Sequence, residues 1–417
     1  MRDLLVLAIT SASIYLGLFR PWMGVIALAL FTFGNPHRYA WGYTRSMPLY
    51  FVVFISVVIG MVFNGKDRQA FPWTRETTLF IMLLSWFTLT TYLSPDIPYA
   101  AKDQWIKVMK IYISIFPTFW MINTKDKMKW LIIVLAVSFG FIGFKGGLFA
   151  FTHGFSYRVQ GPDGTFYAGN NEIGLALNMT LPLILLGAQQ FEKKIIKNSF
   201  YAVFFFSVCA IISTWSRGAL VTLLVVLSAI ILSSKKKTRI VVLFLAASIV
   251  ISTLPPGKLK SILPAEWFDR METIETYEED ASAMGRIDAW NYGFRRANRS
   301  PLTGGGFETY RIFGTDAHSA YFEILGEHGY FALILWLSLL FGTMFALERL
   351  RFQARYVQNY LWIRDYARAV QLSLLGYAVG GAFLGVAYWD YFYQLVSLCV
   401  LMKIFLHRGI AEQRRLI

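Results

Sequence analysis

The protein has 417 residues, of which 56% are hydrophobic and only 16% are charged, and its formal net charge is +15. Soluble globular domains are about 45–50% apolar and about 25% charged. The composition therefore excludes an ordinary soluble domain, a disordered chain and a small secreted scaffold, and it indicates a chain embedded in a lipid bilayer. The positive charge by itself would suggest a nucleic acid or an anionic surface as partner, so its position along the chain decides its meaning.

Apolar runs of about 17–25 residues predict membrane-spanning helices. The fold class is therefore an all-α polytopic integral membrane protein of about twelve transmembrane helices. The predicted spans are 3–36, 49–64, 78–94, 105–121, 129–151, 172–190, 199–214, 218–234, 239–254, 320–348, 367–386 and 390–407. The first run is too long for one straight helix, and Arg20-Pro21 breaks it either into two half-crossings or into a kinked helix. We interpret it as one kinked pass.

Lysine and arginine residues are concentrated in every second short loop. The loops at 66–75, 125–129, 193–197, 235–239 and 349–368 are basic, as are Arg2 and the tail from residue 403 onward. Because cytoplasmic loops of membrane proteins are enriched in these residues, both termini and these loops are predicted to be cytoplasmic. They account for the net charge without a nucleic-acid partner.

One long segment, 255–318, is predicted to be an external loop. It divides the chain into N-terminal membrane helices at 1–254 and C-terminal membrane helices with a cytoplasmic tail at 319–417. The loop contains Pro255-Pro256, an acidic run from Glu275 to Asp280 and three consecutive glycines, and long loops of this kind are more often functional than simple connectors.

Several cations break the charge rule because they lie in external loops or near the external ends of spans. A cation at membrane depth is costly unless it faces a polar cavity or an anion, although long side chains can also reach the interface. Arginine binds two phosphate oxygens at once. The set therefore predicts an external anion site, with a lipid pyrophosphate as the natural ligand, formed by Lys102, Lys107, Lys110, Lys145, Arg158, Arg217 and Arg286.

His318 lies where the long loop re-enters the membrane, next to Asp316 and shortly before Glu323. Histidine can accept a proton near neutral pH, as a general base must. A second interpretation is an interfacial histidine at the start of a helix near Ser319.

The glycines Gly304, Gly305 and Gly306 permit close backbone approach to a ligand, or form a flexible loop. The two cysteines, Cys209 and Cys399, form no CxxC pattern, and no histidines show metal-binding spacing, so neither a metal site nor a cofactor is expected.

Four short motifs, in this order, carry a family resemblance: Ser216-Arg217-Gly218, Gly285-Arg286-Ile287-Asp288-Ala289-Trp290, the stretch Pro301 to Phe307, and the stretch from His318-Ser319 through Tyr321 to Gly329. Together with the predicted topology they resemble the O-antigen ligase family, which includes O-antigen polymerases and protein O-oligosaccharyltransferases. The N-terminal half is similar to O-glycosylation ligases of exosortase-type systems. One departure is Ser319, where the family often has asparagine.

The resemblance implies a membrane glycosyltransferase of the C class in the bacterial inner membrane, with its active site facing the periplasm. The donor would be a glycan on undecaprenyl pyrophosphate, and the acceptor a hydroxyl of lipid A-core or a protein Ser/Thr. His318 would be the general base, and Arg217 and Arg286 would bind the pyrophosphate without a metal ion, with inversion at the anomeric carbon. The remaining external cations, the three glycines and Tyr321 would bind substrate.

Two alternatives stay open. The same donor could serve a protein O-oligosaccharyltransferase or a polymerase. A lipid-linked glycan transporter would also have about twelve spans, although transporters are more often built from inverted repeats, which are not evident in this sequence.

Overall fold

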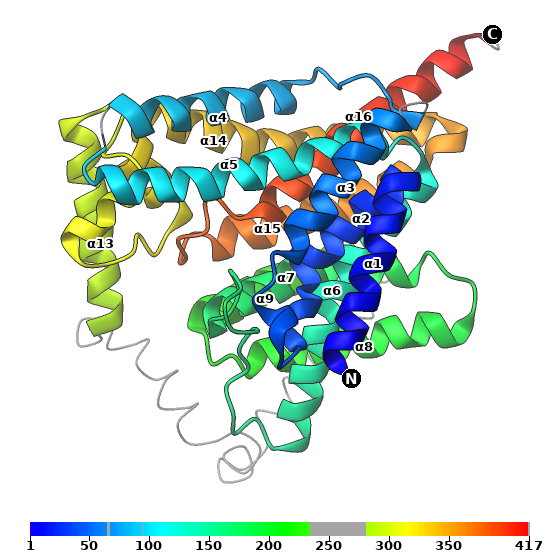
Figure 1. Cartoon of the computed structure of the whole chain (residues 1–417), viewed down its shortest axis with the longest axis horizontal. Coiled ribbons are helices and arrows are strands. Elements are labelled where there is room, and N and C mark those ends of the chain that lie inside the picture. Colours follow the sequence, from blue (N-terminus) through cyan, green and yellow to red (C-terminus); the bar gives the residue numbers. More distant parts are fainter. Residues whose placement is uncertain (65–66, 94, 234–280, 416–417) are drawn as a thin grey trace.

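The computed structural model describes residues 1–64, 67–93, 95–233 and 281–415. Within these ranges the chain is helical and has no β-strand (Figure 1). The α-helices are α1 (Arg2–Phe19), α2 (Pro21–Ala29), α3 (Leu49–Phe63), α4 (Arg75–Leu93), α5 (Pro98–Met121), α6 (Lys125–Thr152), α7 (Asn170–Ala188), α8 (Lys194–Ile212), α9 (Arg217–Leu232), α13 (Ala281–Arg299), α14 (Ala320–Gln353), α15 (Trp362–Gly380) and α16 (Asp390–Arg415). Short π or 3-10 turns are η1 (Leu30–Gly34), η2 (Pro36–Tyr39), η3 (Tyr43–Arg45), η5 (Thr309–Phe313), η6 (Ala354–Tyr356) and η7 (Gln358–Tyr360).

Six of the described helices, α1, α6, α7, α8, α14 and α16, are long and apolar enough to cross a membrane, and shorter apolar helices include α3 and α9. Every predicted span coincides with one or more helices except 239–254, which lies outside the described residues together with the basic cluster at 235–237 and the stretch 255–280. The all-helical, membrane-embedded class is therefore confirmed, while the number of twelve crossings stays a prediction.

Buried aromatic side chains and close helix contacts form the core. Tyr391, Phe392 and Tyr393 on α16 are fully buried, and the ring of Phe392 stacks on Tyr377 of α15 with centroids 4.6 Å apart. At the contact of α6 with α8, a Cβ on Gly147 would overlap the carbonyl oxygen of Phe206. Small residues let helices approach in this way, which maximises van der Waals contact where lipid offers no hydrophobic driving force.

The prediction of a single pass at 3–36 is wrong. Arg20 has non-helical backbone angles (φ −137°, ψ 72°), and Pro21 begins a new helix that runs back beside α1. The return is shown by two contacts: a Cβ on Gly24 would lie 2.6 Å from the Cα of Gly17, and beyond α2 the Thr44 hydroxyl donates to Asp3 Oδ1, at the start of α1, at 2.7 Å. A proline at the first helical position both ends the preceding helix and is well suited to start the next one, so the break becomes a helical hairpin.

The hairpin also overturns the prediction that both termini lie on the same side. Arg2 donates to the carbonyl oxygen of Tyr39 and lines a groove with Lys145 and Arg158, which were predicted to be external. At the other end of the helices, Arg408 donates to the side chain of Gln69 at 2.8 Å. The N-terminus and the C-terminal helix therefore end on opposite sides of the helical layer, as Figure 1 shows. We call the side that holds Arg217 the Arg217 face.

The described part of the predicted long loop is largely structured. Residues 281–299 form α13, which packs against α14, and Trp290 stacks on Phe322 with ring centroids 5.3 Å apart and planes 8° apart. Figure 1 places α13 across the ends of α4 and α14. The external position of this segment stays a prediction, and its helix was not predicted because α13 is polar and is stabilised by contacts with distant residues.

Candidate functional site

Arg217 is the first residue of α9 and follows a tight turn from α8. The Ser216 hydroxyl caps the helix by accepting from the Ala219 amide at 3.2 Å. Trp215 adopts a left-handed backbone conformation (φ 55°) that non-glycine residues rarely use. The turn is also tied to the start of α7, because Asn170 Nδ2 donates to the Thr214 carbonyl at 2.9 Å. The short turn therefore fixes the direction in which the Arg217 side chain leaves the backbone.

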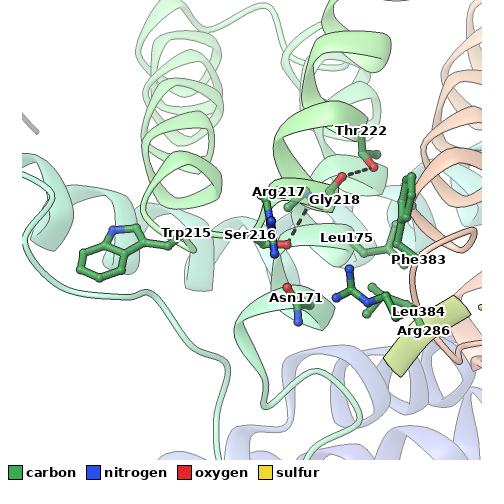
Figure 2. Close-up of a pocket in the computed structure, with 12 residues that line it drawn as sticks. Asn171, Leu175, Trp215, Ser216, Arg217, Gly218, Thr222, Arg286, Phe383 and Leu384 are labelled. Atoms are coloured by element: carbon green, nitrogen blue, oxygen red, sulfur yellow. Dashed lines mark hydrogen bonds between the residues drawn. The ribbon is translucent and has the colours of Figure 1, made fainter. Parts of the chain in front are cut away.

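Arg286 of α13 lies at the same cavity as Arg217. The cavity has a volume of about 80 Å³ and lies among the starts of α7 and α9, helix α13 and the segment after α15. Figure 2 shows the two guanidinium groups directed toward the same space, beside the side chain of Asn171. Two arginines 69 positions apart in the sequence therefore converge, as an anion site requires. The residues that line this cavity are Asn171, Leu175, Trp215, Ser216, Arg217, Gly218, Ala219, Thr222, Arg286, Gly380, Phe383 and Leu384.

The C-terminal half of α13 is anchored by a bidentate ion pair. Arg296 Nε and Nη2 donate to the two carboxylate oxygens of Asp96 at 2.6 and 2.7 Å, and the Thr309 hydroxyl also donates to Asp96. Burial raises the pKa of Asp96, but the hydrogen bonds from Arg296 and Thr309 outweigh it, so the pKa is lower than usual. This pair holds α13 against the connection between α4 and α5, and thereby positions Arg286.

His318 lies beside the cavity but is not among the residues that line it. Its backbone φ is 49°, a strained conformation of the kind that concentrates at functional sites. Two residues later, the Ala320 amide donates to the Gly381 carbonyl at 2.8 Å, which ties this turn to the segment that borders the cavity. Burial and then the positive charge of Arg286 lower the pKa of His318, against the opposing charges of Asp316 and Glu172. The imidazole is therefore held neutral at neutral pH.

The three glycines lie elsewhere. The amide of Gly305 donates to the Gly326 carbonyl at 2.9 Å, and the amide of Gly306 donates to the Glu327 carbonyl at 2.7 Å. The Gly305 carbonyl accepts from the backbone amide of Asp96. A Cβ on Gly304 would lie 2.6 Å from the Glu327 backbone. The glycine run is therefore a close-packed joint between α14 and the α4–α5 connection, away from the arginine cavity.

The remaining predicted substrate-binding residues do not converge on this cavity. Lys102 and Lys107 are exposed on α5, and Lys110 lines a separate cavity with Asp390. Tyr321 packs its ring against Trp336 and donates to the Ala378 carbonyl at 2.7 Å. Lys145 and Arg158 line a further groove on the Arg217 face.

Sequence reasoning missed the polar neighbours of the arginines. Asn171 and Thr222 line the cavity, and Glu172 acts on the charge of His318. Asn171 and Glu172 stand in the first turn of α7, where polar residues commonly begin a helix, so the sequence offered no signal of their proximity to Arg217.

Another histidine of the matched motif region, His328, is structural. The side chain of His328 is fully buried, and its Nδ1 lies 2.6 Å from the Thr90 hydroxyl. Its ring packs against Phe87 and Phe307, with centroids 4.4 Å away in each case. His328 therefore serves the packing of the helices.

Comparison with known families adds two matches. Residues 1–178 match a family of unknown function designated DUF5935, and residues 202–337 match the family described as O-Antigen ligase. No curated protein matches the chain. The N-terminal match names no activity, so the resemblance to exosortase-type glycosylation ligases stays a prediction. The second match spans Arg217, Arg286 and His318, and it confirms, for residues 202–337, the resemblance to the O-antigen ligase family.

Proposed function

We propose that the protein is an O-antigen ligase, which transfers a glycan from undecaprenyl pyrophosphate to a sugar hydroxyl of lipid A-core at the periplasmic side of the inner membrane. The observation that carries this proposal is the convergence of Arg217 and Arg286 on one cavity, within the part of the chain that matches the O-antigen ligase family. The coarser statement, that the protein belongs to a group of glycan-transferring membrane enzymes, follows from the family match.

The proposed reaction is a direct displacement. The acceptor hydroxyl oxygen attacks the anomeric carbon, and the bond from that carbon to the pyrophosphate oxygen breaks, which inverts the anomeric centre. Arg217 and Arg286 stabilise the negative charge that develops on the leaving pyrophosphate. Two guanidinium groups supply the positive charge that balances the leaving pyrophosphate, so the proposal does not require a metal ion.

His318 accepts the hydroxyl proton in this scheme. Its lowered pKa keeps the imidazole in the neutral form that a base needs. The strained turn at residue 318 supports the role, because a left-handed backbone at a non-glycine residue is kept only where surrounding contacts impose it.

The test is glycan transfer in a ligase-deficient strain that expresses the protein. We expect Arg217→Ala and His318→Ala each to reduce transfer about a hundredfold or more, with unchanged amounts of protein in the membrane. His318→Gln separates loss of the base from loss of packing, and full activity of the Arg217→Ala and His318→Ala variants would refute the mechanism.

The acceptor needs a separate experiment. Deleting the gene from its own host should abolish the lipopolysaccharide ladder on gels if lipid A-core is the acceptor. An intact ladder with glycoproteins missing from a mass-spectrometric survey would instead identify a protein O-oligosaccharyltransferase. Purified protein that moves lipid-linked glycan across liposomes without transferring it would identify a transporter.

A further inference from the structure

A second basic site lies on the Arg217 face. It is a groove of about 640 Å³ formed where the N-terminus, the segment that follows α2, helix α6 and the loop after α6 meet. Its basic side chains are Arg2, Arg38, Arg45, Lys145 and Arg158. The helical hairpin of α1 and α2 creates this cluster, because it brings Arg2 to the side where Lys145 and Arg158 lie.

Aromatic rings hold several of these cations in place. The guanidinium of Arg2 lies 4.0 Å from the ring centre of Trp41, and that of Arg158 lies 5.1 Å from the ring centre of Trp215. The ammonium of Lys145 lies 5.9 Å from the ring centre of Tyr39. Stacking on a ring restrains a guanidinium but leaves its edge donors available to a ligand. The cations are therefore positioned before a ligand arrives.

Acidic residues do little to neutralise the groove. Among its described lining residues Asp163 is the one acid, and it lies 3.7 Å from Arg45 with 89% of its side chain exposed, so the pair is weak. Asp3 is nearby, but its carboxylate accepts from both the amide and the hydroxyl of Thr44. In addition, Arg38 Nε is buried and has no hydrogen-bond partner within the described structure. This excess of positive charge favours an anionic ligand.

The surroundings of the groove favour a lipid-borne anion. Trp41, Tyr157 and Phe149 are exposed by 80%, 57% and 45%, and large aromatic side chains of this kind gather where a membrane protein crosses the lipid headgroup region. Trp215, on whose ring Arg158 stacks, also lines the Arg217 cavity. In Figure 2 its indole points away from the two arginines of that cavity. A ligand in the groove would therefore lie next to the transfer site.

We propose that this groove binds the phosphate-bearing headgroup of the acceptor lipid and so holds the acceptor sugar beside the Arg217 cavity. The proposal deepens the proposed function and rests on it. It also assigns Lys145 and Arg158 to the acceptor and not to the pyrophosphate of the donor. The recognised chemistry is a phosphate group, which could come from a lipid headgroup or from a soluble phosphate.

The test measures binding without any donor. Full-length protein in detergent is titrated with diphosphorylated lipid A, with lipid A whose phosphates have been removed, and with inorganic pyrophosphate, and binding is followed by native mass spectrometry. The probe variant is Arg45→Gln with Arg158→Gln, since both side chains are exposed. The charge-matched control is Arg414→Gln with Arg415→Gln at the far end of α16, on the opposite face. Matching circular dichroism spectra confirm folding.

We expect the diphosphorylated lipid to bind the probe variant about thirty-fold more weakly than the wild type, because each basic residue near an anionic surface contributes about a fivefold change. The control variant should bind like the wild type, and Asp163→Asn should bind more tightly. Unchanged binding by the probe variant, or equal binding of dephosphorylated lipid A, overturns the proposal. Saturation of the groove by inorganic pyrophosphate at the same concentration as the lipid would overturn the lipid assignment.

These outcomes are separable from a failure of the proposed function. If the chain is not a ligase, wild-type protein transfers no glycan, yet the binding titration still reports on the groove. If only the groove assignment fails, Arg217→Ala still abolishes transfer while the probe variant binds and transfers like the wild type.

Discussion

The two ends of helix α13 use arginine in opposite ways. Near its C-terminal end, Arg296 forms a bidentate ion pair with Asp96, and the two side chains are only 12% and 21% exposed. Ten residues earlier, Arg286 lines the cavity that also contains Arg217. The same residue type on the same helix thus anchors the protein at one end and lines a cavity at the other.

The difference lies in the neighbours and not in the residue. Asp96 reaches Arg296 from a segment 200 positions away in sequence, whereas Arg286 lines the cavity that also contains Arg217. The two histidines of the same region divide in a similar manner, because His328 is enclosed by aromatic rings while His318 stands on a strained turn near charged groups. Substitutions can therefore distinguish a structural arginine or histidine from one that serves the site.

The largest expected effect is on stability. Arg296→Ala leaves Asp96 without its partner and should lower the free energy of unfolding by about 3–5 kcal/mol, measured by thermal unfolding in detergent. Because the pKa of Asp96 is lowered in the folded protein, this contribution is complete at neutral pH and disappears only as the pH falls through that lowered value. The control is Arg311→Ala, which removes an exposed pair with Glu308 and should cost less than about 1 kcal/mol. Equal losses would contradict the assignment of Arg296 as the anchor.

At the other end of α13 the effect should be on activity. Arg286→Ala is expected to reduce glycan transfer about a hundredfold with a smaller change in the unfolding temperature than Arg296→Ala, and Arg286→Lys should recover part of the activity because the charge remains but the bidentate geometry is lost. Arg295→Ala, an exposed arginine on the same helix, should leave transfer intact. If Arg286→Ala lost as much stability as Arg296→Ala, Arg286 would be an anchor too, which would contradict its assignment to the site.

The pH dependence of transfer offers a finer test. Transfer should fall about tenfold per pH unit once the pH drops below the pKa of His318, since the protonated ring is not a base. Because burial and Arg286 lower that pKa, the decline should begin at a more acidic pH than for an ordinary histidine. Arg286→Gln removes one of these causes, so the residual activity of this variant should begin to decline at a higher pH. An unchanged acidic limb would show that another group controls the profile.

The smallest effects concern the glycine joint. Gly304 and Gly314 both have left-handed backbone angles (φ 62° and 75°), but only Gly304 is packed against other residues. Gly314→Ala should cost about 1–2 kcal/mol for the backbone conformation alone, while Gly304→Ala should cost more, because its Cβ would meet the backbone of Glu327. Unfolding temperatures of the two variants compare the costs directly. Equal costs would mean that α14 can shift to accommodate the new side chain.

Several features of the site were predictable because they depend on local sequence. The short turn before Arg217 and the re-entry at His318 stand at the ends of apolar runs, and those ends can be read from composition. A shared anion site for Arg217 and Arg286 was expected from cations at external positions, and the family resemblance separated these two from the other five cations. The role of the glycines was misjudged, because a glycine needed for close packing and one needed for a ligand look alike in a sequence.

The amino-acid sequence alone indicated a helical membrane protein, the positions of most of its helices, and the family that residues 202–337 resemble. Each of these is set by composition or by short motifs over a few tens of residues. Only the tertiary structure decided that Pro21 starts a returning helix, that Arg2 joins Lys145 and Arg158, and that Arg286 faces a cavity while Arg296 is anchored. These features depend on the angles and contacts between helices, which are set by packing among residues that are far apart in the chain.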